Sequence, residues 1–274
     1  MENTEEVKNE DNTDKITDSN FKNKLEPRNS KNSPFKGLNF SHLFKESNLF
    51  WVFVAGIFAL FIWNIPIISF ILYPFKLFVT YVHEASHGVA AIITGGHFLK
   101  LTMEWDTSGL AYTSGGWRVL VISAGYLGSS IFGGLLFLVA FRKGWEKVIL
   151  IGLGAFFLIC TILFARNPVA LVTGFTFGIL FLILIKYSNK LVTIFIGFLA
   201  IQNCFYSFVD LSNLFNISVT SNINTDAMAM SQELTKGVLP APVFVLVWLI
   251  MSIIIFIVFL QIINSHLRSL KNEE

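Results

Sequence analysis

Residues 49–73, LFWVFVAGIFALFIWNIPIISFILY, decide the class of fold, because they carry no charged side chain over a length that can cross a bilayer. A membrane-spanning helix needs about 20 consecutive apolar residues. Pro66 lies inside this run, where a proline can kink the helix. A second apolar segment begins at Pro74, and proline is tolerated in the first turn of a helix. We therefore predict a separate second helix over residues 74–95.

Further apolar runs follow along the rest of the chain. They are residues 119–141, 148–164, 168–186, 191–214 and 242–263, with a polar connection over residues 215–239 before the last. Lysines and arginines are divided almost evenly between the two sides of these runs, so the positive-inside rule sets no orientation. The pattern predicts an all-α polytopic membrane protein with about six to seven transmembrane helices.

The composition supports a membrane protein with a polar tail at each end. The chain of 274 residues is 54% hydrophobic and only 14% charged, whereas soluble domains carry roughly 25% charged residues. Almost half of the charges fall within residues 1–48, a polar stretch without periodicity that we interpret as a disordered N-terminal tail. The transmembrane domain then occupies residues 49–264, and residues 265–274 form a short polar C-terminal tail.

Charge and cysteine content narrow the range of partners. The formal net charge is only +2, and no basic patch is interleaved with aromatic residues, so nucleic acid is not expected as a partner. Cys160 and Cys204 both lie in apolar runs and give neither a disulfide framework nor a Cys-x-x-Cys metal signature. A lipid bilayer is the expected surrounding, and the oligomeric state is not set by the sequence.

A change of pattern follows the second apolar segment. Residues 97–117, HFLKLTMEWDTSGLAYTSGGW, alternate apolar and polar side chains and contain Ser108-Gly109 and Gly115-Gly116 as turn signals. Alternation with a period of two indicates β-strands rather than a helix. We therefore predict a small β-hairpin insertion near residues 97–117.

The second apolar segment contains His83, Glu84 and His87, which spell H-E-x-x-H. Ionisable side chains are costly inside a membrane, so such a cluster indicates a functional site. On a helix, residues four apart share a face, and the two imidazoles can bind one metal ion. Glu84 lies about 100° further around the axis, where a carboxylate can take a proton from a water molecule. Zn²⁺ is the expected ion.

A catalytic zinc site usually has three protein ligands. Asp210 is the only acidic residue besides Glu84 in the apolar runs, and we predict it as the third ligand. Two alternatives stay open: Asp210 could cap a segment at the membrane edge, and Asp226 could be the ligand instead. For Asp226 we favour an N-cap role in a short helix within residues 215–239.

HEASHGVAAIITGG (83–96), the Gly-rich hairpin and SAGYLGSS (123–130) together resemble the site-2 protease family of intramembrane zinc metalloproteases. The resemblance is to the compact branch without a PDZ domain, and it covers roughly residues 77–134. It implies Zn²⁺ on His83 and His87, with Glu84 as general base. The family's second core helix carries G-x-x-x-(N/S/G), which Gly125 to Ser129 fit.

The resemblance also implies that the hairpin guides the substrate as an added strand, since a strand edge offers unpaired backbone groups to an extended peptide. We expect four residues of the hairpin and the second motif to bind substrate. They are Gly109, Gly125, Gly128 and Ser129. Small residues in SAGYLGSSIFGG also allow close packing against the histidine helix.

The leading prediction is an intramembrane zinc metalloendopeptidase that cleaves membrane-spanning or membrane-adjacent proteins by zinc-activated water. One alternative is an inactive pseudoprotease that acts as a membrane chaperone or regulator. The other is a transporter with a histidine relay, although no internal repeat supports it. The expected location is integral and multi-pass, in the cell membrane or in an internal membrane such as a thylakoid.

Overall fold

The computed structural model describes residues 66–140, 146–187, 189–220 and 225–272. The predicted tail over residues 1–48 and residues 49–65 of the first apolar run lie outside them. The described elements all belong to one compact unit, Phe53–Glu274.

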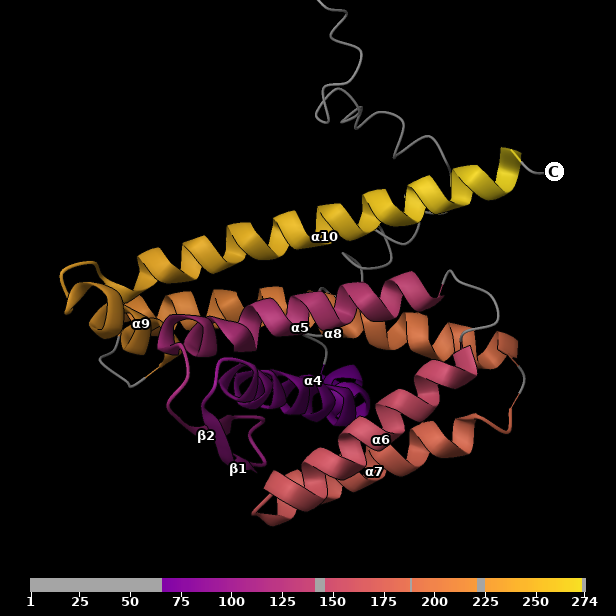
Figure 1. The fold of residues 1–274 in the computed structure, drawn as a ribbon, viewed down its shortest axis with the longest axis horizontal. Coiled ribbons are helices and arrows are strands. Elements are labelled where there is room, and N and C mark those ends of the chain that lie inside the picture. The colour runs from indigo at the N-terminus through magenta and orange to yellow at the C-terminus, as the bar shows by residue number, and fades with distance from the viewer. Residues whose placement is uncertain (1–65, 141–145, 188, 221–224, 273–274) are drawn as a thin grey trace, which may run out of the picture. The chain divides into compact units, whose positions relative to one another are not determined.

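The described residues form seven helices and one two-stranded sheet (Figure 1). The helices are α4 (Pro66–Ile93), α5 (Arg118–Ala140), α6 (Glu146–Phe164), α7 (Pro168–Leu184), α8 (Asn189–Thr220), α9 (Asp226–Thr235) and α10 (Ala241–Asn272). The strands are β1 (His97–Met103) and β2 (Gly109–Ser114). The predicted helical class with one hairpin is confirmed.

Four helices contain segments long and apolar enough to cross a membrane. These segments are Arg118–Leu138, Lys147–Phe164, Val192–Thr220 and Ala241–Ile263, and α7 is a shorter apolar helix. Only 22% of the window in α10 is buried within the molecule, so most of that helix presents apolar side chains outward, as a lipid-facing helix does. The number of spans agrees approximately with the six to seven predicted.

The first two predicted segments meet in one continuous helix. α4 runs from Pro66 to Ile93 with Pro74 in its interior, so the prediction that Pro74 opens a separate helix is wrong. A proline inside a helix removes one N–H from the hydrogen-bond ladder, and neighbouring packing must compensate. At the other end of the chain, α10 continues through residues 265–272, part of the stretch predicted as a polar tail.

Aromatic side chains hold α4 against α6 and α7. Phe78 is fully buried and stacks on Phe157 of α6 with 5.3 Å between ring centroids, and Phe177 of α7 lies 4.8 Å from Phe78. The Tyr81 hydroxyl lies 2.8 Å from the Thr161 hydroxyl. These contacts fix the rotation of α4 about its axis and therefore the direction in which its histidines point.

A second core joins α5, α8, α9 and α10. Its buried residues include Tyr126 of α5, Leu211 of α8, Met230 of α9 and Trp248 of α10. In Figure 1, α5 and α8 run side by side, and the two helices also contact each other extensively. This core places the short helix α9 beside the end of α5.

The hairpin pairs β1 and β2 antiparallel, with Met103 opposite Gly109 and an irregularity between Phe98 and Lys100. The outer edge of β1 is occupied by the loop between α6 and α7. The Arg166 N–H donates to the Leu101 carbonyl at 3.0 Å, and Asn167 accepts from the Met103 N–H at 3.1 Å. The other edge of the hairpin, formed by β2, borders a cavity over α4.

Candidate metal centre and active site

One cavity of about 500 Å³ gathers the residues of the histidine helix and those that face it. Its lining comes from α4, β2, α5, α8 and α9 and includes His83, Glu84, His87, Asp210 and Asp226. Segments far apart in the sequence, from α4 to α9, therefore meet at one point. The site is assembled by the fold as a whole and not by the motif alone.

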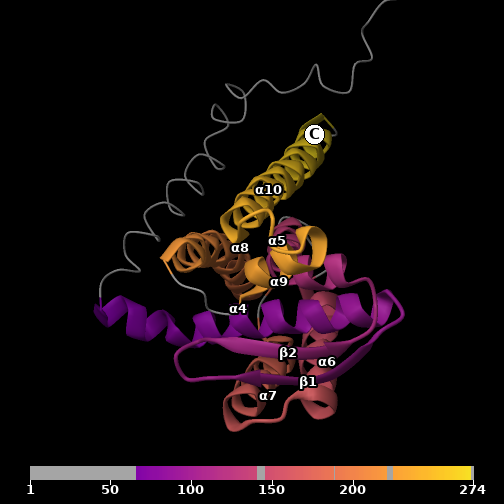
Figure 2. The same ribbon diagram turned by 90° about the vertical axis from the view of Figure 1, so that its left-hand side faces the viewer.

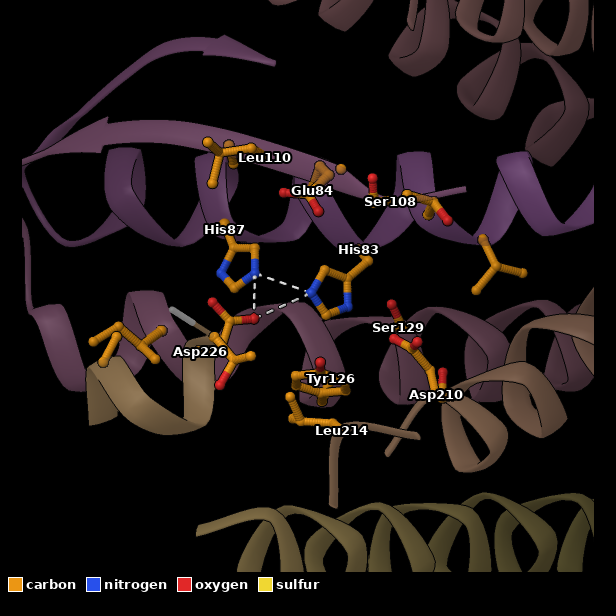
Figure 3. A pocket seen from close by; sticks show the side chains of 18 of the residues that line it. His83, Glu84, His87, Ser108, Leu110, Tyr126, Ser129, Asp210, Leu214 and Asp226 are labelled. Carbon is orange, nitrogen blue, oxygen red and sulfur yellow. Dashed lines mark hydrogen bonds and ion pairs between the residues drawn. The ribbon is translucent and has the colours of Figure 1, made fainter. Parts of the chain in front are cut away.

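His83, His87 and Asp226 form a triangle of possible ligand atoms (Figure 3). The Nε2 atoms of the two histidines lie 3.1 Å apart. Oδ2 of Asp226 lies 3.5 Å from Nε2 of His83 and 3.4 Å from Nε2 of His87. Among the described residues this is the group of three that could hold a metal ion.

Asp226 reaches this position because another residue caps α9. The Thr225 side chain accepts a hydrogen bond from the Met228 N–H, so Thr225 is the N-cap and the predicted N-cap role of Asp226 is wrong. Asp226 is then the first residue of α9, where the helix dipole favours a negative charge. Ala227 and Met230 anchor α9 in the buried core, which directs the Asp226 carboxylate toward α4.

The electrostatic setting keeps the Asp226 carboxyl ionised. Burial by itself would raise its pKa. The charge of His87 and hydrogen bonds from both imidazoles outweigh burial and lower the pKa of Asp226 below its usual range. An ionised carboxylate facing two imidazole nitrogens is one of the donor sets found in catalytic Zn²⁺ sites.

Both imidazoles are held by neighbours outside the triangle. Nδ1 of His87 lies 2.7 Å from the Val121 carbonyl oxygen, which accepts a hydrogen bond from the ring N–H, and this contact turns Nε2 toward His83 and Asp226. The His83 ring packs edge-on against Tyr126 at 4.6 Å, and Tyr126 stacks on Trp248 at 5.2 Å. These contacts orient the nitrogens before any ion binds.

The glycines of the second motif let α5 approach α4 closely. A methyl group at Gly125 would overlap the Nε2 atoms of both His83 and His87. One at Gly128 would lie 2.6 Å from Cβ of Ser86 on α4. The predicted packing of this Gly-rich helix against the histidine helix is therefore present, and Gly128 serves it without lining the cavity.

Glu84 is 6% exposed and points toward β2. Its carboxylate accepts a hydrogen bond from the Ala111 N–H. A Cβ atom at Gly109 would lie 2.7 Å from Oε1 of Glu84, so only glycine leaves room there. The carboxylate therefore lies between the two histidines and the strand edge.

Asp210 lies on α8 and lines the same cavity but does not belong to the triangle. Figure 3 shows it with Ser129 on the far side of His83 from Asp226. The prediction that Asp210 is the third ligand rests on its place in an apolar run. A threonine before Asp226 was the available signal, since Thr225 can cap a helix and leave the next carboxylate free.

A helical membrane protein with an H-E-x-x-H helix, an opposing carboxylate and a bordering strand edge has the architecture of a membrane metallopeptidase. The family model described as Peptidase M50B-like matches residues 51–259. The chain therefore belongs to this family, the site-2 protease family that its motifs resemble, whose members are integral membrane proteins. No curated protein and no solved structure matched the chain.

Proposed function

We propose that the protein is an intramembrane zinc metalloendopeptidase in which His83, His87 and Asp226 bind the metal. The observation that carries this proposal is the spacing of the three ligand atoms, 3.1, 3.4 and 3.5 Å. Tetrahedral zinc with bonds of about 2.0–2.1 Å separates its ligand atoms by about 3.3 Å. Two imidazoles and one carboxylate also leave a fourth position for a reacting group.

In this proposal the third ligand is Asp226 and not Asp210, the residue predicted from the sequence. The reason is proximity, since Asp226 contacts both imidazoles and Asp210 contacts neither within the described part of the chain. Three ligands from two helices would then join α4 to α9.

Glu84 is the proposed general base. A bound Zn²⁺ supplies a Lewis acid that polarises a carbonyl and makes water nucleophilic near neutral pH. Glu84 would accept a proton from the attacking water and pass it to the amide nitrogen of the leaving peptide. The hydrogen bond from the Ala111 N–H holds the carboxylate in place for this transfer.

The edge of β2 that faces the cavity is the proposed substrate platform. β1 already pairs with the α6–α7 loop, while β2 borders the cavity next to Glu84. An extended segment of a membrane protein added beside β2 would bring its backbone to the carboxylate. Gly109 keeps this approach open because any side chain there would collide with Glu84.

The test uses full-length protein purified in detergent and loaded with zinc. We expect about one zinc per chain in the wild type and in Glu84→Gln, and strongly reduced zinc in Asp226→Ala and His83→Ala. Unfolded casein serves as a generic probe, and its cleavage is followed by mass spectrometry. The wild type should cut it and Glu84→Gln should not. Cleavage that survives Glu84→Gln contradicts the proposed mechanism, and zinc without any cleavage favours the inactive regulator.

A further inference from the structure

Helix α8 presents a polar face to the cavity. Tyr206, Ser207, Asp210 and Asn213 line it at spacings that place them on one side of the helix. The Tyr206 hydroxyl lies 3.4 Å from the Thr107 hydroxyl in the hairpin turn. In Figures 1 and 2, α8 and the hairpin lie on opposite sides of α4. Because β2 and these α8 residues line the same cavity, a segment bound along β2 would have α8 as part of its wall.

Two polar groups beside this face, one on α5 and one on α8, have no hydrogen-bond partner among the described residues. The Ser129 hydroxyl is buried, with 1% of the residue exposed, and has no hydrogen-bond partner. Asp210 is partly buried, and no hydrogen bond or ion pair joins its carboxylate to another described residue, although the charges of His83 and Asp226 act on it across the cavity. Asn203, seven residues before Asp210 on α8, donates its side-chain N–H to the Ser129 carbonyl, which ties Ser129 to this face of α8.

Leaving such groups unpaired is costly because Ser129 is buried and Asp210 is partly buried. A carboxylate without a partner loses the solvation it would have in water. The proposed metal ion would bind Asp226 directly, but it would not bind Asp210. The missing partner of Asp210 can be supplied by a substrate.

The charges of the cavity indicate the sign of that partner. Its acidic residues are Glu84, Asp210 and Asp226, and its described basic residue besides the proposed ligands His83 and His87 is Arg118. The Arg118 guanidinium already donates to the Glu233 carboxylate at 2.8 Å and is neutralised by it. The two positive charges of a divalent ion would balance the negative charges of two of the three carboxylates. The third negative charge could then be balanced by a positive charge on the substrate.

We propose that Asp210 and Ser129 form a subsite that selects a basic side chain, lysine or arginine, in the substrate segment next to β2. The ammonium or guanidinium group donates to the Asp210 carboxylate and to the Ser129 hydroxyl oxygen. The inference rests on the proposed function, because it assigns specificity to the same cavity. It makes Asp210 a specificity residue and not a metal ligand.

The test measures binding in the zinc-loaded Glu84→Gln protein, so that no peptide is cut during the titration. The probes are two fluorescent eight-residue peptides of valine and threonine with blocked ends, which differ at one central position. One carries lysine and the other norleucine, which has a similar stem without the charge. A peptide of this length can bind beside β2 in more than one register, so a single lysine is enough to reach the subsite.

We expect the lysine peptide to bind at least about tenfold tighter, as for hydrogen bonds between charged groups. Adding Asp210→Asn should bring the two affinities to about the same value, with zinc content unchanged. Ser129→Ala should reduce the lysine preference by about threefold. Glu104→Gln is the matched control, because Glu104 is an exposed acid in the hairpin turn outside the cavity, and the preference should persist.

Three results would overturn the subsite. They are equal affinity for both peptides in the starting protein, a lysine preference that survives Asp210→Asn, and loss of zinc in Asp210→Asn. The proposed function fails separately. If protein with Glu84 intact keeps the tenfold preference but never cleaves the lysine peptide, the subsite stands and proteolysis does not.

Discussion

At the scale of single residues, substitution tests which of two aspartates in the same cavity is the proposed third metal ligand. Asp226→Asn keeps the shape of the side chain but removes its charge, so we expect zinc affinity to fall by at least about tenfold. Asp210→Asn should leave zinc affinity close to that of the wild type. Competition with a chromogenic chelator measures both. The reverse order of effects would show that Asp210 is the ligand.

Only part of the candidate site can be predicted from the sequence. His83, Glu84 and His87 are found from spacing alone, because a helix places residues four apart on one face. Asp226 lies 139 residues beyond His87, in a polar connection, and only the packing of α9 brings it to the histidines. Its position depends on Thr225 capping the helix, a choice between two adjacent capping residues that the sequence leaves open.

Gly125 gives a second prediction at this scale. A methyl group there would overlap the Nε2 atoms of both histidines, so Gly125→Ala should force α5 and α4 apart or turn the imidazoles. Overpacking of this kind costs about 1–3 kcal/mol. We expect most of the bound zinc to be lost. Gly152→Ala on α6 is the control, because a methyl group there meets nothing within 4 Å and its zinc content should stay unchanged.

At the scale of elements, Asn167 joins the hairpin to α7. Its side chain accepts hydrogen bonds from the Met103 N–H and the Ala170 N–H, and it donates to the Met103 carbonyl. Asn167→Ala removes the N-cap of α7 and the cover of β1 together, so we expect a loss of about 1–2 kcal/mol. Asn167→Asp keeps both acceptor functions and should lose less.

The measurement for Asn167 is thermal unfolding together with zinc content and peptide binding. Zinc content should be unchanged in both variants, because Asn167 lies outside the triangle of ligands. Peptide binding should weaken in Asn167→Ala as β2 loses its support. A normal unfolding temperature in that variant would show that the loop does not hold the hairpin.

The elements themselves follow from sequence to different degrees. Alternation over residues 97–117 predicts the hairpin because a strand turns every second side chain to one face. The boundary at Pro74 is wrong because a local rule for proline ignores the packing that carries α4 through it. Phe78, Tyr81 and their partners on α6 and α7 supply that packing and lie far away in the sequence.

At the scale of the whole molecule, the proposed metal joins α4 to α9 and thereby joins two parts of the chain that no short connection holds together. A ligand that binds only the folded state stabilises it by about 4 kcal/mol at a concentration of 1,000 times its Kd. Removal of zinc by a chelator should therefore lower the unfolding temperature of the wild type. It should leave the double variant His83→Ala, His87→Ala unchanged.

Hydrogen exchange locates this effect within the fold. After chelation, amides of α9 over residues 226–235 should exchange faster, because the Asp226 carboxylate no longer shares an ion with α4. Amides of α6 and α7 should keep their protection, since the Phe78 and Phe157 packing that holds them involves no ligand. Equal loss of protection in α6, α7 and α9 would mean that the metal supports the whole fold, and no change in α9 would exclude Asp226 as a ligand.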